Sequence, residues 1–285
     1  MVESHDGPAE ALRPSRVPFR CPHCALDLRV QGREFRCEGG HSFDRAREGY
    51  VNLLVGGRLA GGPSGYDDAM VRARREVFDA GLYDPLIDAI AARAGEMSPT
   101  TVLDAGCGEG TYLARATDLN RADAYGIDIS KTAVRLAARR HVPHQYAVAS
   151  SFRLPFADAA FDVVLNVFSP RPFDEMLRVL RPGGIAVVAT PGAGHLAQLK
   201  AFVYDRPVEH REHSEIQDAD RGGFELAGVE RVAFTVDLSS DVLRLRLLEM
   251  TPYWWSTTTQ RRDHIAATPF EVDVDVLVRS YRRPG

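Results

Sequence analysis

The stretch TVLDAGCGEGTYLARA, residues 101–116, joins three local patterns that together decide the fold. The apolar run TVLDA predicts a short buried strand, the glycines that follow predict a tight turn, and TYLARA predicts the start of a helix. Alternating strands and helices build an α/β domain around a mostly parallel sheet. Glycines directly after a strand let the backbone come very close to a ligand. We therefore expect an α/β domain with a ligand site at the carboxyl end of this strand.

The spacing of these glycines indicates the kind of ligand. Asp104-x-Gly106-x-Gly108-x-Gly110 differs from the dinucleotide pattern GxGxxG and is typical of the first motif of class I S-adenosylmethionine (SAM) methyltransferases. In that interpretation the glycines admit the methionine moiety, and Asp104 binds its amino group directly or through water. Cys107 is interpreted as a small residue that fills the loop rather than as a nucleophile.

A second predicted strand, residues 124–129, carries an acidic residue near its end. Asp128 is expected to bind the ribose hydroxyls, as acidic residues do at this position of doubly wound nucleoside-binding folds. Ile129 is expected to pack on the adenine ring. Ser130 is suited to cap the helix KTAVRLAARR that follows.

A third predicted strand, residues 145–150, leads into a further cofactor segment. Methyltransferases often carry an aspartate at the position of Ser150, where it binds the adenine amino group, and this chain lacks it. We therefore expect adenine to be bound by the backbone or by Ser150 and Ser151, with Phe152 beside them.

The fourth predicted strand, residues 161–170, ends at the edge of the sheet where substrates bind in such folds. Asn166 and Phe168 are the candidates for substrate contact there, Phe168 by stacking on a base and Asn166 by orienting its edge. Asp162 is interpreted as structural. The turn LRPGG and the strand IAVVATP follow, and we expect the Rossmann-like, mostly parallel sheet of seven strands that class I methyltransferases have.

Two further β-rich stretches close the chain, residues 231–238 and 270–278. The second alternates strictly between apolar and polar residues, which predicts a half-buried or edge strand. Between them stand the two tryptophans, Trp254 and Trp255. They are interpreted either as an anchor in the core or as an aromatic wall for a base that has left its helix.

Three of the four cysteines lie near the front of the chain, in CPHCALDLRVQGREFRCEGGH, residues 21–41. Four residues in this stretch form a set with the ligand types and spacing of a structural zinc site: Cys21, Cys24, Cys37 and His41. A complete Cys3His set leaves no position for water, so the site is structural rather than catalytic. The alternatives are two incidental turns, or His23 as a rival ligand. A hairpin with its turn at Gln31-Gly32 is expected between the two ligand pairs.

Composition divides the chain further. We expect a flexible tail at 1–18, a zinc-binding module at 19–55, a glycine-rich linker at 56–66 and a methyltransferase domain at 67–285. Residues 11–75 hold twelve Arg and no Lys against seven acidic residues, although the whole chain carries a net charge of −4. Such a basic front end suggests contact with a polyanion, or else it is a plain solvated surface. The absence of a secretory signal and of a long apolar run predicts a cytoplasmic protein without membrane contact.

Taken in order, these motifs resemble a known family. CPxC…C…H, EGYVNLL, ARREVFDAGLYDPL, VLDAGCGEGTY, GIDISKTAV, ASSFRLPF, LRPGG, ATPGxGHLxxLK and MTPYWW are similar to the RlmA family of 23S rRNA (guanine-N1-)-methyltransferases. That family includes housekeeping enzymes and a branch that confers resistance to tylosin-type macrolides. The resemblance runs from residue 19 to about residue 283.

The resemblance implies methyl transfer from SAM to N1 of a guanine in a 23S rRNA hairpin, one structural zinc per chain, and a homodimer. Arginines on or near the zinc module would then contact RNA phosphates: Arg29, Arg33, Arg36, Arg45 and Arg47. Two other functions stay open. One is a small-molecule methyltransferase with the zinc module as a stabilising cap, and the other is a non-catalytic RNA-binding protein.

Overall fold

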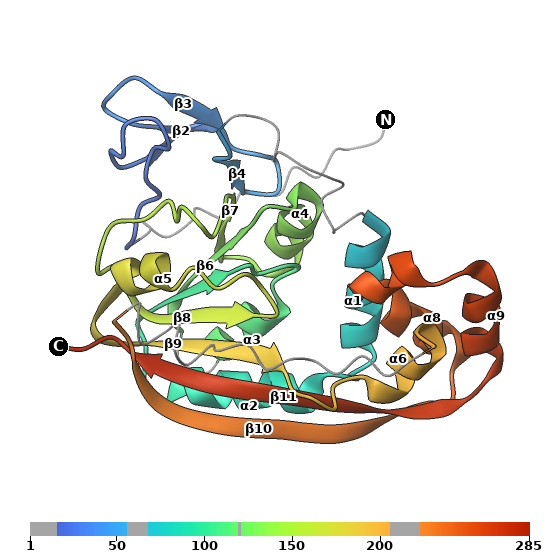
Figure 1. The fold of residues 1–285 in the computed structure, drawn as a ribbon. Coiled ribbons are helices and arrows are strands. Elements are labelled where there is room, and N and C mark those ends of the chain that lie inside the picture. Colours follow the sequence, from blue (N-terminus) through green and yellow to red (C-terminus); the bar gives the residue numbers. More distant parts are fainter. Residues whose placement is uncertain (1–15, 56–67, 119–120, 206–222) are drawn as a thin grey trace, which may run out of the picture.

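The computed structural model of the protein describes residues 16–55, 68–118, 121–205 and 223–285. Its centre is an eight-stranded sheet with the order β10-β11-β9-β8-β5-β6-β7-β4, and a three-stranded sheet stands beside it (Figure 1). The predicted α/β class is confirmed. The predicted seven strands are one too few, because the front module supplies β4 (Val51–Asn52) as an additional edge strand.

Six neighbouring strands of the large sheet pair in parallel. Besides β4 they are β5 (Thr101–Ala105), β6 (Asp123–Asp128), β7 (Gln145–Val148), β8 (Phe161–Val167) and β9 (Leu180–Pro191). β11 (Phe270–Arg282) runs antiparallel to β9, and β10 (Glu225–Leu238) pairs antiparallel with β11, so β10 again runs in the direction of the other strands. Of the two interpretations of 270–278, the edge strand is wrong, because β11 pairs on both sides, with β10 and with β9. The half-buried strand is correct for Glu271–Val274, where buried valines alternate with acidic residues that are at least partly exposed.

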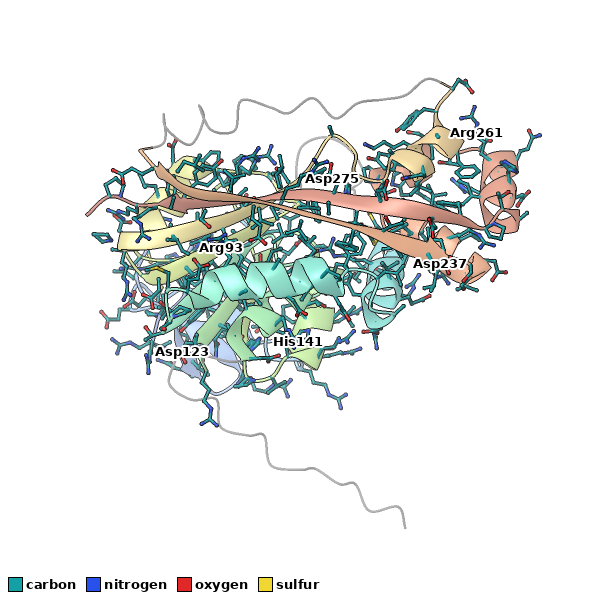
Figure 2. All side chains as sticks on the ribbon, turned by 90° about the horizontal axis from the view of Figure 1, so that it is seen from below. Arg93, Asp123, His141, Asp237, Arg261 and Asp275 are labelled. Atoms are coloured by element: carbon teal, nitrogen blue, oxygen red, sulfur yellow. The ribbon has the colours of Figure 1, made fainter. Side chains whose placement is uncertain are left out.

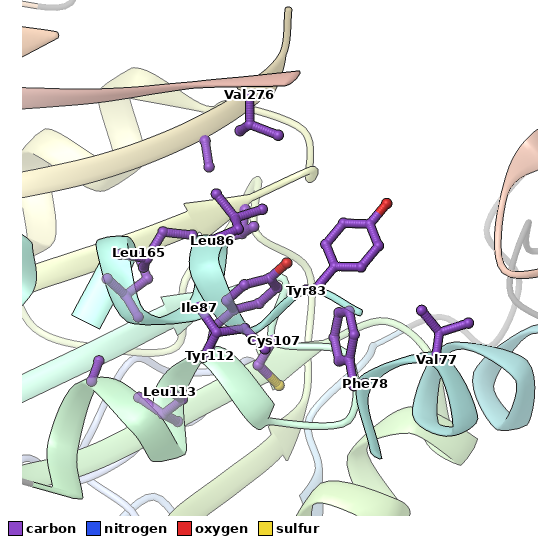
Figure 3. Close-up of a cluster of buried hydrophobic side chains, with 14 of the residues drawn as sticks. Val77, Phe78, Tyr83, Leu86, Ile87, Cys107, Tyr112, Leu113, Leu165 and Val276 are labelled. Atoms are coloured by element: carbon purple, nitrogen blue, oxygen red, sulfur yellow. The ribbon is translucent and has the colours of Figure 1, made fainter. Parts of the chain in front are cut away.

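Helices on one face of the sheet and at the carboxyl ends of its parallel strands contribute to one hydrophobic cluster with it (Figure 1). They are α1 (Asp68–Asp79), α2 (Asp84–Gly95), α3 (Thr111–Asp118), α4 (Lys131–Arg140), α6 (Ala197–Val203), α8 (Asp241–Glu249), and α9 (Thr259–Ala267), together with the 3-10 helix η1 (Pro252–Ser256). Figure 3 shows Phe78, Tyr83 and Tyr112 in this cluster. Ser130 caps α4 as predicted, since its hydroxyl accepts a hydrogen bond from the Ala133 N–H at 3.2 Å.

The opposite face is covered by α5 (Phe173–Val179) and by the front module. The module contains the three-stranded sheet of β1 (Arg29–Gln31), β2 (Glu34–Arg36) and β3 (Ser42–Asp44). Phe19 carries the contact with the large sheet: its ring lies 6.5 Å from that of Tyr125 and 5.3 Å from that of Phe156. The expected β1–β2 hairpin forms, and Gly32 in its turn has a φ of +63°, a conformation that glycine adopts without strain.

Backbone hydrogen bonds also tie the front module to the sheet. β4 pairs with β7, and the Leu53 N–H donates to the Val148 carbonyl at 2.9 Å. Val17 lies within the predicted tail, yet its side chain is buried and its N–H donates to the Tyr125 hydroxyl at 3.0 Å. The predicted linker at 56–66 lies outside the described residues. Within the described parts of the chain, none of the helices has the length and apolar character needed to span a bilayer.

Candidate active site and zinc centre

The four predicted zinc ligands converge on one point. The three thiols of Cys21, Cys24 and Cys37 and a ring nitrogen of His41 lie within 4.8 Å of one another. Two tight turns position them, one before β1 and one between β2 and β3. Three soft sulfur donors and one imidazole are a standard set for tetrahedral zinc, with no ligand position left for water.

The surroundings of the cluster fit a metal as well. A Cβ atom placed on Gly39 would lie 3.1 Å from the Cys24 Sγ, so a larger residue there would push against the ligands. Burial raises the pKa of Cys37, but hydrogen bonds from the backbone and ring of His41 and from the neighbouring thiols outweigh burial and bring it to about 6. Zinc binds the thiolate form that this lowered pKa favours. His23 is not part of the cluster; its ring lies beside those of His41 and Phe43.

The glycine loop after β5 turns sharply, with positive φ at all three glycines of the motif. At Gly106 the turn also brings two segments together, since a Cβ atom there would lie 2.1 Å from the Oγ of Ser169, in the loop after β8. The sequence predicts that the backbone at Gly106 comes close to the methionine moiety. The structure shows that it also comes close to Ser169. The loop is therefore fixed both by its own conformation and by its neighbour.

Asp104 lies at the end of β5 and is almost completely buried. Neither of its carboxylate oxygens has a hydrogen-bond partner among the described residues. Burial raises its pKa to about 8; Arg74 opposes this shift, and the carboxylates of Asp128 and Glu109 add to it. Asn166, at the end of β8, likewise has a buried side-chain oxygen without a partner in the described residues. Unpartnered buried acceptors are costly, and an ammonium group would satisfy them.

Two charged residues that the sequence analysis did not select lie next to this carboxylate. Glu109 is buried in the glycine loop, and Arg74 of α1 approaches it with 3.6 Å between Nε and Oε1. The Arg74 guanidinium also lies 4.7 Å from the Phe78 ring. A signal for Arg74 exists in the sequence: it stands between Met70 and Phe78 at helical i, i+4 spacing, on the buried side of α1.

Asp128 ends β6 beside the glycine loop. One carboxylate oxygen accepts the Gly108 N–H at 3.0 Å and the other accepts the Ser130 N–H at 2.8 Å. Burial raises its pKa, and these backbone hydrogen bonds oppose the shift. The next two predicted contacts, Ile129 and Phe152, follow neighbouring strands of the sheet and expose apolar side chains.

The two serines that follow β7 differ in burial. Ser150 is half-buried, and its hydroxyl accepts the Phe152 N–H at 3.2 Å, whereas Ser151 is buried. The predicted cofactor residues thus all lie at the carboxyl ends of β5, β6 and β7, where adjacent parallel strands end side by side.

The two candidates for substrate contact lie at the end of β8 and in the loop after it. Asn166 is fully buried, and its amide donates to the carbonyls of Ala105 and Pro170 at 3.0 and 2.9 Å. It therefore holds the loop to the end of β5. Phe168 is half-buried with a φ of +50°, a conformation that costs energy for a bulky side chain and clusters at functional sites.

Phe168 lines a cavity of about 400 Å³ at this edge of the sheet. Its walls come from α1, the loops after β8 and β9, and the segment around η1: Met70, Arg74, Phe78, Tyr83, Phe168, Ser169, Pro170, Arg171, Pro191, His195, Leu196, Met250, Thr251, Pro252 and Tyr253. We call this cavity the acceptor pocket. The tryptophans are not in its wall; Trp254 packs against the hydrophobic cluster and under Arg262, and Trp255 is exposed. Tyr253 takes the place that the aromatic-wall interpretation gave to them.

A larger cavity, of about 750 Å³, lies between the zinc module and residues 149–158. Its arginines already bind partners within the protein, for example Arg178 with Glu175 and Asp158, and Arg20 with Asp27. Asp104 and the glycine loop do not line it. The acceptor pocket is therefore the candidate for the site of the chemistry, because it shares Arg74 and Ser169 with the surroundings of the glycine loop.

Comparison with known families separates the two parts of the chain. Residues 19–55 match a zinc-ribbon family described as RlmA, N-terminal, and residues 102–184 match a family described as Methyltransferase domain. The malonyl-[acyl-carrier protein] O-methyltransferase of Pseudescherichia vulneris is 32% identical, but the similarity covers only 39% of this chain and 47% of that protein.

Two relatives match far more of the chain. The 23S rRNA (guanine(748)-N(1))-methyltransferase of Streptomyces fradiae is 42% identical over 83% of this chain and 85% of its own length. A protein of Micromonospora griseorubida, named provisionally as a 23S rRNA (guanine-N(1)-)-methyltransferase, is 36% identical over 95% of this chain and 99% of its own. The chain combines a Cys3His zinc ribbon with a SAM-type glycine loop after β5. It belongs to the RlmA family of 23S rRNA (guanine-N1-)-methyltransferases.

Proposed function

We propose that the protein transfers a methyl group from SAM to N1 of a guanine in a hairpin of 23S rRNA. The observation that carries this proposal is the union of the two modules: the zinc ribbon covers one face of the methyltransferase sheet and adds a strand to it. The Streptomyces fradiae relative, whose name states this reaction, is similar over 83% of the chain. Tylosin-type macrolide resistance and a cytoplasmic location are parts of the same proposal.

In this proposal the glycine loop and Asp104 hold the methionine end of SAM. Asp104 accepts hydrogen bonds from the ammonium group, and the positive φ angles of Gly106, Gly108 and Gly110 turn the backbone tightly beside the chain of the cofactor. Arg74 supplies the positive charge that the methionine carboxylate needs. When bound, SAM provides a methyl group on a positively charged sulfur, which is open to attack by a nitrogen.

The nucleoside end of SAM lies along the ends of β6 and β7. Each oxygen of Asp128 already accepts one backbone hydrogen bond and keeps a lone pair for a ribose hydroxyl. Ile129 and Phe152 enclose the adenine ring from neighbouring strands. Ser150 and Ser151 bind its polar edge in place of the aspartate that this chain lacks.

The guanine enters the acceptor pocket. N1 lies on the Watson–Crick edge, so a paired guanine must be flipped out of its helix before it can react. Phe168 and Tyr253 are aromatic side chains of the pocket wall, and stacking between such rings holds a flipped base. Asn166 does not face the base in this proposal; its amide holds in place the loop that carries Phe168.

The zinc ribbon, residues 19–55, holds the RNA. Arg29, Arg33, Arg36 and Arg47 expose their side chains, whereas Arg45 is half-buried. Arg29 stands directly opposite Arg36 across the β1–β2 pair, and like charges in that position repel each other unless an anion lies between them. Glu34 neutralises Arg36 in part, at 2.6 Å. RNA phosphates complete the neutralisation, and a homodimer of the chain encloses the hairpin between two such surfaces.

A small-molecule methyltransferase is the second candidate, because a pocket of about 400 Å³ also suits a metabolite. One assay separates the two. Purified protein, labelled SAM and protein-free 23S rRNA should give 1-methylguanosine in the digested RNA by mass spectrometry, and a reverse-transcription stop at the modified base, because N1 methylation blocks pairing. Methylation of N2, N7 or a ribose would overturn the proposal. Transfer of the label from SAM to metabolites but not to the RNA would also overturn it.

Arg29→Glu tests the RNA surface without harm to the fold, because the new carboxylate stands opposite Arg36 and pairs with it. RNA affinity should fall, and the slope of log K against log salt should become shallower by about 0.9 for each lost phosphate contact. Arg115→Glu is the control: it makes the same charge change on α3, on the opposite face of the sheet, and also removes an exposed ion pair with Asp88. Equal losses in both variants would contradict a phosphate contact at the zinc ribbon.

A further inference from the structure

His195 lies in the loop after β9 and lines the acceptor pocket. Its side chain is buried, and its ring centre is 5.6 Å from that of Phe168. It therefore stands next to the side chain on which, in the proposed function, the flipped guanine stacks. None of the sequence motifs discussed above assigns it a role.

The hydrogen bonding of the ring fixes its tautomer. The backbone N–H of Asp275, in β11, donates to the Nδ1 of His195 at 3.3 Å. An atom that accepts a hydrogen bond carries a lone pair, so the neutral ring holds its proton on Nε2. Nδ1 faces the β11 backbone, and Nε2 lies on the other edge of the ring. The neutral ring can thus donate from Nε2 but cannot take up a proton there.

The loop that carries the ring is held rigidly to β11, near the middle of the long antiparallel ribbon (Figure 2). The Gly192 N–H donates to the Asp275 carbonyl at 2.8 Å, the Gly194 N–H donates to its carboxylate at 2.9 Å, and the Leu196 N–H donates to the Asp273 carbonyl at 2.8 Å. Leu196 has a φ of +53°, a strained conformation that these bonds maintain. A donor held in this way needs no reorganisation when charge develops beside it.

Guanine methylation at N1 develops such a charge. N1 carries a proton in the neutral base, and the negative charge left by its departure is shared with O6. We infer that His195 Nε2–H donates a hydrogen bond to guanine O6 and stabilises this charge, an inference that rests on the proposed function. The N1 proton passes to water, the N1 electron pair forms the bond to the methyl carbon, and the electrons of the broken S–C bond stay on sulfur. The anion and the sulfonium thereby both become neutral.

The same donor selects the base. Guanine presents an acceptor at O6, whereas adenine presents an amino donor at the corresponding position. A fixed N–H facing adenine would leave two donors opposed, which is a costly arrangement in a buried pocket. His195 thus accounts for discrimination by the pocket between guanine and adenine without a charged side chain.

Other titratable groups surround the loop and the pocket, and they belong in any account of a pH profile. They are Asp273 and Asp275 on β11, Arg231 on β10, and Arg74, Tyr83, Arg171 and Tyr253 around the pocket. A hydrogen bond from Arg231 lowers the pKa of Asp275, so this carboxylate stays ionised through the neutral range. Burial raises the pKa of Tyr253 to about 12, so this phenol stays protonated.

His195→Ala and His195→Gln test the inference with single-turnover methylation of 23S rRNA at saturating SAM, from pH 6 to 9.5. The alanine variant should be slower by about 100- to 1,000-fold, the effect of losing one donor to a developing oxyanion. Its rate should also continue to rise to higher pH than the wild-type rate, because the N1 proton is held more tightly. Glutamine offers an amide N–H at a similar reach and should restore most of the rate and the position of the pH profile.

Three results would overturn the inference. The first is a slower alanine variant with an unshifted pH profile, which would make His195 structural. The second is a normal rate at saturating SAM with weakened SAM affinity in calorimetry, which would make it a cofactor ligand. The third is a wild-type protein that forms no 1-methylguanosine; this result alone would also remove the proposed function, so the two failures are distinguishable.

Discussion

The zinc centre and the acceptor pocket are built in opposite ways. All four zinc ligands come from 21 consecutive residues, and two short turns bring them together. The wall of the acceptor pocket comes from residues as far apart as Met70 and Tyr253, brought together by the order of strands in the sheet. A site formed by local turns can be recognised from spacing, whereas a site formed by a sheet edge depends on contacts that spacing does not encode.

The two sites are nevertheless joined by the fold. The zinc ribbon buries Phe19 against Tyr125 of β6, and Asp128, at the end of that strand, anchors the glycine loop. Substitutions that remove the zinc should therefore also destabilise the large domain with its glycine loop. Substitutions in the glycine loop should leave the zinc bound. The following experiments examine this asymmetry.

Cys24→Ser should have the largest effect. Loss of one thiolate should reduce zinc from one per chain to less than one tenth, because zinc ribbons take their folding energy from the metal, about 10 kcal/mol or more in small modules. The loss should also lower the melting temperature of the large domain, because Phe19 and β4 lose their support. Metal analysis and calorimetry measure both.

Cys107→Ala is the matched control, because Cys107 is the remaining cysteine and lies in the glycine loop. It should retain a full zinc content. A Cys24→Ser protein that lost zinc yet melted like the wild type would show that the two sites are energetically independent, contrary to the continuous core described above.

Gly106→Ala should abolish measurable SAM binding, a loss of more than about 100-fold. The residue has a φ of +105°, and the added Cβ would meet the Ser169 Oγ at 2.1 Å. Gly183→Ala is the control, since Gly183 also has a positive φ but nothing lies within 4 Å of its Cβ position. It should destabilise the fold by about 1–2 kcal/mol and leave SAM affinity unchanged.

The double variant Gly106→Ala with Ser169→Gly distinguishes a clash with Ser169 from backbone strain at residue 106. Recovery of SAM binding would assign the effect to the contact with Ser169, and no recovery would assign it to backbone strain. If titration calorimetry gave wild-type SAM affinity for Gly106→Ala itself, the glycine loop would not be the cofactor site. Each of these variants should still bind one zinc per chain.

Asp104→Asn should weaken SAM binding by about 1.5–3 kcal/mol, the scale for a hydrogen bond to a charged group. Because the pKa of Asp104 is raised to about 8, the wild-type carboxyl is mostly protonated at pH 6 and must release its proton to bind an ammonium. Wild-type affinity should rise from pH 6 to 7.5, with proton release detectable in buffers of different ionisation enthalpy. The asparagine variant should show neither effect.

The pH dependence of folding stability at Asp104 is opposite to that of SAM affinity: stability falls as the pH rises. The folded carboxyl keeps its proton up to a pH of about 8, whereas the unfolded one loses it near 3.8, so its contribution to the unfolding free energy falls as pH rises between these values. Asp104→Asn should flatten that decline in the protein without SAM. Asp162→Asn, on the neighbouring strand but bound to the backbone of Thr100 and Thr101, should lower stability and leave SAM affinity unchanged.

Tyr125→Phe should have the smallest effect. It removes the hydroxyl that accepts the Val17 N–H and keeps the ring that packs on Phe19, so the free energy of unfolding should fall by about 1 kcal/mol. Denaturant titration with zinc bound measures this change. A loss above about 3 kcal/mol would show that the hydrogen bond, rather than ring packing, carries most of the coupling between ribbon and sheet.

The sequence by itself determined the features that depend on neighbours along the chain. The ligand spacing from Cys21 to His41, the glycine turn after β5 and the cap at Ser130 are each set within a few residues, so composition and spacing were sufficient to predict them. The strands and the mostly parallel order followed from apolar runs that alternate with helical patterns. The family resemblance rested on the same short motifs.

Only the tertiary structure decided which distant residues meet. Spacing gave no sign that β4 of the zinc ribbon would join the methyltransferase sheet, that β11 would lie inside it, or that Tyr253 rather than a tryptophan would line the pocket. The spacing along α1 places Arg74 on the buried side of that helix, but the groups that Arg74 and His195 meet appear only when α1 and the loop after β9 are placed against Asp104 and Phe168. The physical reason is that strand pairing and side-chain packing bring together groups that are far apart in the chain, and the energy of those contacts is not written in any local pattern.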